Sequence, residues 1–249
     1  MRSPWLVRIN QSPIAKPERV MMVWVARQLP SWLKPDHMTM LGMAGSLLYA
    51  VAFVTSVTSI SWLWLAAIGL VLNWAGDSLD GNLARERKIE RPQYGFFVDH
   101  TSDIISQVLI FMGMGLSVHV KFETGCLLLL SYWLAALLTF IRALSDRVFR
   151  ISYFGIGPTE IRIGLLIHVL SLLTIGRIPI WASDVGLMSL MDVLAILIFV
   201  IVLTSFVVMA WQESRRLNAL DTAPNGLEQP DSGTVATDTI LALRDTSAS

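Results

Sequence analysis

The stretch NWAGDSLDGNLARERKIERPQYGFFVDHTSD, from Asn73 to Asp103, decides how the rest of the chain is organised. It places four aspartates, Asp77, Asp80, Asp99 and Asp103, between segments that are apolar enough to lie in a membrane. If both flanking segments are helical, Asp77 and Asp80 occupy adjoining positions on one helix, and Asp99 and Asp103 lie one turn apart on another. Two carboxylate pairs can therefore meet across one contact between helices.

A cluster of four carboxylates at membrane depth needs cations, because the charges repel one another and lose their hydration. Ligand sets made only of oxygen favour magnesium, manganese or calcium. Two such ions held by four aspartates can bind a pyrophosphate, neutralise charge on a leaving phosphate and align an attacking hydroxyl. The sequence therefore predicts a divalent-metal site.

The same residues resemble the signature of the CDP-alcohol phosphotransferase family, D-x-x-D-G-x-x-A-R, then a spacer, then G-x-x-x-D-x-x-x-D. The eight matching positions are Asp77, Asp80, Gly81, Ala84, Arg85, Gly95, Asp99 and Asp103. The spacer from Glu86 to Tyr94 holds nine residues, one more than the usual eight, which we interpret as a loop insertion near Pro92. Eight residues at matching offsets are far more specific than an isolated glycine motif.

The resemblance implies an enzyme of membrane phospholipid synthesis. Such an enzyme transfers a phosphoryl-alcohol or phosphatidyl group from a CDP-activated donor to a hydroxyl acceptor, releases CMP and uses two divalent cations, Mg²⁺ or Mn²⁺. Asp77, Asp80 and Asp99 would be metal ligands, while Asp103 would complete the metal site and act as the base on the acceptor hydroxyl. At least one substrate would be a lipid, and a homodimer is an expectation carried over from the family.

Small residues and one arginine near the aspartates are predicted to bind the donor. Gly81 and Ala84 let a flat nucleotide or a phosphate lie against the helix, and Arg85 is a candidate bidentate phosphate clamp. By the resemblance, Gly95 and Thr39 belong to the same site. Each has a plainer interpretation: Gly81 as a helix-packing position, Arg85 as a cytoplasmic anchor and Thr39 as a helix cap.

His100 follows Asp99 directly, and this Asp-His pair is similar to the choline and ethanolamine phosphotransferase branch. A histidine is a natural base near neutral pH, so His100 is a second candidate for the base beside Asp103. The alternative is a packed histidine with no proton role. The pair favours CDP-choline or CDP-ethanolamine with diacylglycerol over CDP-diacylglycerol with a small alcohol.

The segment GIGPTEIRIG, Gly155–Gly164, is similar to G-P-T-E-x-R segments of the family, where it lies near the acceptor pocket. Arg162 is therefore a candidate ligand of a phosphate or anionic headgroup, and Glu160 of a cationic one. Anchoring at the membrane surface explains Arg162 equally well. His168 and Asp192 are single ionisable residues in apolar segments, for which packing and an interfacial position are the plainer interpretations.

The composition is typical of a membrane protein. Of the 249 residues 54% are hydrophobic and 15% charged, and the mean hydropathy is +0.59, so we predict an all-α polytopic integral membrane protein. The formal net charge is zero, which gives no indication of nucleic-acid binding. The single cysteine, Cys126, excludes an intrachain disulfide and a C-x-x-C metal site.

Apolar segments divide the chain into three expected parts. Residues 1–37 form a cytoplasmic segment whose amphipathic helix, Pro17–Leu29, is too short to span a bilayer and lies at its interface. Residues 38–216 form a six-helix membrane domain, and residues 217–249 form a disordered cytoplasmic tail. The expected spans are Met38–Thr58, Ser61–Asn82, Tyr94–Val118, Thr124–Leu144, Thr159–Ile175 and Val185–Trp211.

The distribution of Lys and Arg predicts the orientation. These residues gather before the first span, after the second, around the link between the fourth and fifth, and after the sixth, whereas the first link has none. By the positive-inside rule both termini and the aspartate cluster are cytoplasmic. The expected location is the inner membrane of a bacterium.

Two other functions fit parts of this pattern. Intramembrane aspartates and a histidine also mark transporters and ion pathways, but the Gly-x-x-Ala-Arg element between the aspartates has no role in such a protein. A catalytically inactive scaffold would not need all eight signature residues.

Overall fold

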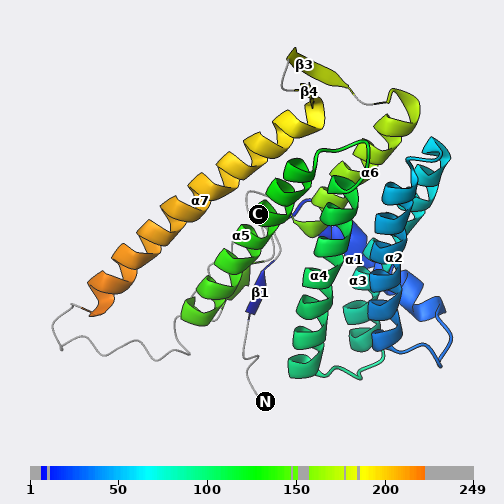
Figure 1. The fold of residues 1–249 in the computed structure, drawn as a ribbon. Coiled ribbons are helices and arrows are strands. Elements are labelled where there is room, and N and C mark those ends of the chain that lie inside the picture. The colour runs from blue at the N-terminus through cyan, green and yellow to red at the C-terminus, as the bar shows by residue number, and fades with distance from the viewer. Residues whose placement is uncertain are drawn as a thin grey trace.

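The computed structural model describes residues 7–9, 12–146, 148–150, 157–176, 178–183 and 186–221. Within these residues it contains seven α-helices and four short strands (Figure 1). The helices are α1 (Ala15–Gln28), α2 (Pro35–Thr55), α3 (Leu63–Glu86), α4 (Pro92–Gly115), α5 (Phe122–Asp146), α6 (Pro158–Thr174) and α7 (Leu190–Asp221). A 3₁₀ turn, η1 (Ile60–Trp62), precedes α3. The strands are β1 (Val7–Ile9), β2 (Val148–Arg150), β3 (Pro179–Ser183) and β4 (Gly186–Ser189).

Prolines set the starts of three helices. Pro35, Pro92 and Pro158 are the first residues of α2, α4 and α6, where a missing N–H and a fixed φ suit the helix. The link between α3 and α4 therefore covers residues 87–91. The nine-residue spacer of the signature thus ends at Tyr94, inside the first turn of α4, and Gly95 is the fourth residue of that helix.

Helix α1 is amphipathic, as the sequence predicts. Met22 and Ala26, one turn apart, are buried against α3, while Val20 and Trp24 are exposed. An exposed ion pair, Arg27 Nε to Glu86 Oε1 at 2.7 Å, joins the last turns of α1 and α3. The hydrogen bond and negative charge of Glu86 raise the pKa of the Arg27 guanidinium above its ordinary value. The position of α1 at a membrane surface remains a prediction.

Glycines bring α2 and α3 into close contact. A Cβ added to Gly45 would lie 2.5 Å from the backbone N of Asn73, and one added to Gly69 would lie 2.6 Å from the carbonyl oxygen of Gly45. Gly76 meets the backbone of Gly42 as closely. Small residues allow such an approach between helices in a membrane, where dispersion contacts drive packing. This contact fixes the height of Asp77 on α3 relative to α2.

The other helices surround this pair. Helix α2 also packs along α4, α6 packs against α3, and α5 packs against both α4 and α7. Figure 1 shows α2, α3 and α4 side by side, with α7 diverging from them beside α5. The large side chains fully buried in the core between these helices include Tyr49, Phe53, Leu63, Leu70, Met114 and Val169.

Each of the six predicted spans corresponds to a helix, but only part of the six-span prediction is confirmed. In the described part of the chain, four segments are long and apolar enough to cross a membrane: Pro35–Thr55, Ile60–Glu86, Phe122–Leu144 and Leu190–Ala219. Helix α6 has 17 residues, and α4 carries Asp99, His100 and Asp103 in its first half. The crossing of the membrane by α4 and α6 therefore stays a prediction.

Short strands modify the all-α expectation. Strands β1 and β2 pair in parallel, with Arg8 opposite Phe149, and β3 and β4 form an antiparallel pair. The predicted start of the last span at Val185 is wrong, because residues 186–189 belong to β4 and α7 begins at Leu190. Helix α7 continues to Asp221, past the boundary expected at residue 217. The predicted disordered tail lies outside the described residues from 222 onward.

Candidate active site

Three of the four signature aspartates form one cluster. Asp77 projects from α3, Asp99 and Asp103 project from α4, and one carboxylate oxygen of each lies within 4.8 Å of the other two. All three side chains are half-buried. The four-residue step between Asp99 and Asp103 puts both on the face of α4 that meets Asp77, as the sequence predicts. Three converging carboxylates are a suitable donor set for Mg²⁺ or Mn²⁺.

The carboxylate of Asp80 is held by a side chain of α2 and by the backbone N–H of the next residue of α3. Its Oδ2 accepts a hydrogen bond from Thr39 Oγ1 at 2.8 Å, and its Oδ1 accepts one from the N–H of Gly81 at 2.5 Å. Thr39, predicted to lie at the nucleotide site, thus contacts the signature directly. Asp80 does not belong to the close cluster of the described residues, and its role as a metal ligand stays a prediction.

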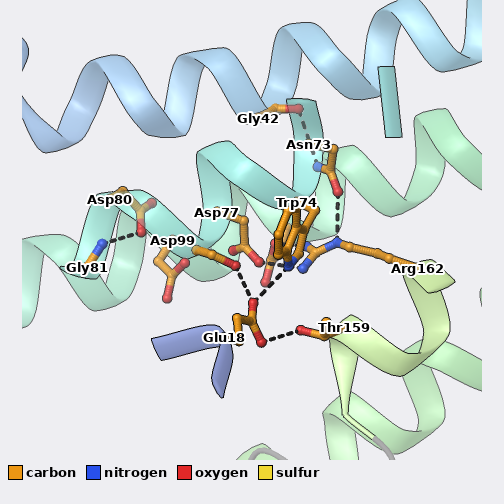
Figure 2. A network of polar contacts seen from close by, with 12 residues as sticks. Glu18, Gly42, Asn73, Trp74, Asp77, Asp80, Gly81, Asp99, Thr159 and Arg162 are labelled. Carbon is orange, nitrogen blue, oxygen red and sulfur yellow. Dashed lines mark hydrogen bonds and ion pairs between the residues drawn. The ribbon is translucent and has the colours of Figure 1, made fainter. Parts of the chain in front are cut away.

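Arg162 reaches the aspartate cluster from α6. Its Nη1 lies 2.6 Å from Asp77 Oδ2, its Nη2 lies 3.8 Å from Asp103 Oδ1, and only 12% of its side chain is exposed. Its Nε donates to Asn73 Oδ1 at 2.9 Å (Figure 2). A buried guanidinium is stable here because two carboxylates balance its charge. The candidate acceptor residue and the candidate metal ligands therefore belong to one site.

Asn73 holds this arginine, and the sequence analysis missed it. Its side chain is buried, and its Nδ2 donates to the carbonyl oxygen of Gly42 at 3.3 Å and to Ser46 Oγ at 2.9 Å. Its Oδ1 is thereby directed at Arg162. The signal was available, since a lone amide within an apolar segment, four residues before Asp77, is unusual in a membrane helix.

Glu18 of α1 was also missed. Its Oε1 accepts hydrogen bonds from Trp74 Nε1 at 2.8 Å and Ser78 Oγ at 2.6 Å, and its Oε2 accepts one from Thr159 Oγ1 at 2.9 Å (Figure 2). One carboxylate thus joins α1, α3 and α6 beside the aspartates. In the sequence Glu18 is an ordinary acidic residue of a first helical turn, so no local pattern reveals this role.

The predicted donor-binding residues lie along the last turns of α3 and the first turn of α4. Arg85 folds back over Gly81, where an added Cβ would lie 3.3 Å from Arg85 Nη1, and its Nη2 donates to Asn82 Oδ1 at 3.0 Å. Ala84 is half-buried. Gly95 is exposed, and an added Cβ there would meet no atom within 4 Å. Gly95 therefore leaves open space on α4, whereas the Arg85 side chain occupies the space over Gly81.

His100 lies in an aromatic setting beside the cluster. Its ring stacks on Phe96 with 4.1 Å between centroids and meets Phe140 edge-on at 5.2 Å. Its Nδ1 lies 2.8 Å from the carbonyl oxygen of Phe96 and 3.6 Å from Asp99 Oδ2. A carbonyl can only accept, so a neutral ring that makes this contact carries its proton on Nδ1.

Glu160 has a local structural role. Its Oε2 accepts a hydrogen bond from the N–H of Gly157 at 2.8 Å, which caps the start of α6, and its Oε1 accepts one from Ser12. Asp192 has a similar role at the start of α7, where its Oδ2 accepts from the N–H and the hydroxyl of Ser189, each at 2.8 Å. Asp192 is buried and also accepts a hydrogen bond from Thr124 of α5, and its interfacial position remains a prediction.

A small cavity of about 20 Å³ adjoins the cluster between α3, α4, α5 and α6. Polar groups of Asp103, Arg162 and Asn73 line it together with apolar side chains such as Ile110 and Leu165. Gln107 also lines it, one turn beyond Asp103 on α4, and is 8% exposed. Its Oε1 has no hydrogen-bond partner among the described residues. The cavity thus offers an acceptor atom to a ligand in a largely apolar space.

Comparisons with known proteins assign the family. Residues 32–211, which include all eight signature positions, match the family model of CDP-alcohol phosphatidyltransferase. The chain is 26% identical to cholinephosphotransferase 1 of Bos taurus over 72% of its own length and 45% of that protein, and 25% identical to the Mus musculus protein of the same name over 73% and 47%. It is 36% identical to phosphatidylinositol phosphate synthase of Cutibacterium acnes over 35% of the chain and 40% of that protein. The chain spans about half the length of these cholinephosphotransferases. With its signature, its helical membrane domain and its aspartate cluster, the chain belongs to the CDP-alcohol phosphatidyltransferase family.

Proposed function

We propose that this protein transfers a substituted phosphoryl group from a CDP-activated donor to a hydroxyl acceptor in phospholipid synthesis, with release of CMP. The observation that carries the proposal is the meeting of Asp77, Asp99 and Asp103 beside a cavity that also exposes Arg162. Membership of the family supports the same reaction. Carboxylates, a guanidinium and an adjoining cavity are what positioning and charge stabilisation in phosphoryl transfer require.

The proposed cofactors are two divalent cations, Mg²⁺ or Mn²⁺. Asp77, Asp99 and Asp103 would hold them, with Asp80 as the fourth ligand. Bound there, the cations would neutralise charge on the pyrophosphate of the donor and on the leaving CMP. Arg162 contacts two of the three clustered carboxylates, so its guanidinium and a bound cation would compete for them. We propose that Arg162 then turns toward the phosphate or the acceptor.

Two residues are candidates for the base that takes the acceptor proton. Asp103 lines the cavity, so its carboxylate can receive the proton directly from a hydroxyl held there. His100 is supported by a different observation: its Nδ1 lies 2.8 Å from the carbonyl oxygen of Phe96, so in a neutral ring that donates there Nε2 would be the nitrogen able to accept a proton. Asp103→Asn removes a metal ligand as well as a base, whereas His100→Gln leaves all four aspartates in place. Mn²⁺ affinity therefore separates the role of metal ligand from the role of base, because we expect only Asp103→Asn to lower it.

For the donor we propose CDP-choline or CDP-ethanolamine, with diacylglycerol as the acceptor. The Asp-His pair and the matches to cholinephosphotransferase 1 over nearly three quarters of the chain support this assignment. The apolar lining of the cavity also suits a lipid alcohol. The second candidate, CDP-diacylglycerol with a small alcohol, is supported by the similarity to phosphatidylinositol phosphate synthase over a shorter stretch.

Donor binding would involve Gly81, Ala84, Arg85, Gly95 and Thr39, which flank the aspartates on α2, α3 and α4. For Glu160 we retain contact with a cationic headgroup as a proposal, although its carboxylate already caps α6. The site would face the cytoplasm, where nucleotides are soluble. A homodimer and a bacterial inner membrane remain proposals, since the relatives include vertebrate and bacterial proteins.

The test is release of CMP by the purified protein in detergent with Mg²⁺ or Mn²⁺. CDP-choline, CDP-ethanolamine and CDP-diacylglycerol are offered separately with matching acceptors, and a chelator serves as the control. Metal-dependent release with one donor is the expected result. Folded, metal-binding protein that releases CMP from none of them would contradict the proposal and favour a carboxylate-lined transporter.

A further inference from the structure

Two neighbouring stripes of α3 hold different partners around the aspartate cluster. Asn73 and Asp77, four residues apart, both contact Arg162 of α6. Trp74 and Ser78, also four residues apart, both donate to Glu18 of α1. Residues spaced by four lie one above the other on a helix, so each stripe presents two groups to one partner.

Glu18 connects the second stripe to the helix that carries Arg162. Its Oε2 accepts from Thr159 at 2.9 Å, and Thr159 lies in the first turn of α6, three residues before Arg162. A closed ring of polar contacts results, which runs from α3 through Glu18 to α6 and returns through Arg162 to Asp77 (Figure 2). In this ring Glu18 and Arg162 form two separate polar links between α3 and α6.

We propose that Glu18 is a positioning residue, which seats the first turn of α6 on α3 and so holds the guanidinium of Arg162 against Asp77. It touches none of the three clustered aspartates in the structure and acts through Thr159 and Arg162. The inference rests on the proposed function for the role of Arg162 in catalysis, but its effect on the cluster is measurable by metal binding alone. It also gives α1 a role in the site.

The direct test is the affinity of the purified full-length protein for Mn²⁺, measured by electron paramagnetic resonance in detergent. Glu18→Ala removes the acceptor of three hydrogen bonds, so α6 loosens and Arg162 competes less well for Asp77. We expect Mn²⁺ affinity to rise about two- to fivefold, which corresponds to the loss of roughly one hydrogen bond. Glu18→Gln, which keeps one carbonyl oxygen, should restore most of the wild-type affinity.

Dependence on Arg162 distinguishes positioning from a general loss of packing. In an Arg162→Gln background Glu18→Ala should leave Mn²⁺ affinity unchanged, because the residue through which it acts is gone. An equal effect in both backgrounds, or none in either, would overturn the proposal. Thr159→Val removes the α6 arm of the ring with little change in volume, and it serves as the test if Glu18→Ala does not fold.

Glu86→Ala is the matched control, because Glu86 also joins α1 to α3 but through an exposed ion pair with Arg27 and without contact to α6. It should leave Mn²⁺ affinity unchanged. If no variant affects metal binding and CMP release still occurs, the positioning proposal fails while the proposed function stands. If Mn²⁺ binding follows the expected pattern but no CDP donor is turned over, the positioning proposal stands and the proposed function fails.

Discussion

At the scale of single residues, the main feature is the contact between the guanidinium of Arg162 and the clustered carboxylates of Asp77 and Asp103. Asp77 carries the shortest contact of Arg162, at 2.6 Å, and the guanidinium is nearly buried. A divalent cation held by the same carboxylates, as we propose, would be repelled by the guanidinium. The sequence predicts both groups as site residues, but their direct contact is known only from the structure.

The first prediction concerns this competition. Arg162→Gln removes a positive charge next to Asp77 and Asp103, and Mn²⁺ affinity should rise by at least about tenfold, since a unit charge at this distance contributes more than that factor at a partly buried site. Equilibrium binding in detergent measures it. Arg142→Gln is the control, because Arg142 lies 4.0 Å from Glu213, between α5 and α7. A lower Mn²⁺ affinity in Arg162→Gln would mean that Arg162 supports the cluster instead.

A second prediction concerns Gln107. Because its Oε1 is buried without a partner among the described residues, Gln107→Leu should raise the free energy of unfolding by about 1 kcal/mol. The same change should raise the KM for the acceptor and leave the KM for the CDP donor unaltered, since the amide lines the cavity beyond Asp103. Thermal unfolding and initial rates measure the two effects. If Gln107→Leu is stabilised but its KM for the acceptor is unchanged, the acceptor does not bind in this cavity.

At the scale of elements, the contact between α2 and α3 positions half of the site. Asp77 and Asp80 depend on the register of α3, and α2 supplies Thr39 and the backbone that holds Asn73. Glycines fix that register because they bring the backbones of α2 and α3 into close contact. The polar contacts of the site are therefore anchored by an apolar interface.

This interface yields the third prediction. Gly45→Ala places a methyl group 2.5 Å from the backbone N of Asn73, so the helices must separate and the free energy of unfolding should fall by roughly 1–3 kcal/mol. Gly164→Ala on α6 meets no atom within 4 Å, so it serves as a control that retains or slightly raises stability. Thermal unfolding in detergent compares them. Equal stability of both variants would show that α2 and α3 do not pack this closely.

At the scale of the whole molecule, the open question is how many helices cross the membrane. Lys and Arg residues predict that the link between α3 and α4 is cytoplasmic and the link between α2 and α3 is not. Helix α4 is 24 residues long and can reach across a bilayer core, although its first half carries the aspartates. The charges are tolerated because they face the protein and its cluster.

The fourth prediction tests this topology. In a Cys126→Ala background, single cysteines at Ser59, Glu90 and Ser117 report on the ends of α2, α3 and α4. A membrane-impermeant maleimide applied from the cytoplasmic side should label only the cysteine at Glu90, and label applied from the other side should reach the cysteines at Ser59 and Ser117. If the cysteines introduced at positions 90 and 117 are labelled from the same side, α4 does not span the membrane.

Local sequence was sufficient for the helices and the signature. Apolar segments of spanning length, helix-initial prolines and aspartates at steps of three and four predict which residues are helical and which share a face. Such signals depend only on residues near one another in the chain. They also allowed the family to be identified, because the signature lies within a single stretch of about thirty residues.

The tertiary structure alone decided which distant residues meet that stretch. Arg162 is 85 residues from Asp77 in the chain and Glu18 is 60 residues from Ser78, so no local pattern relates them. Asn73 could be noticed in the sequence, but its partner could not. The contacts arise because packing of α1 and α6 against α3 buries polar groups, and each buried group must find a partner within reach. The sequence by itself determined a family, a set of helices and an aspartate signature, whereas long-range packing decided how Arg162, Asn73 and Glu18 come together beside those aspartates.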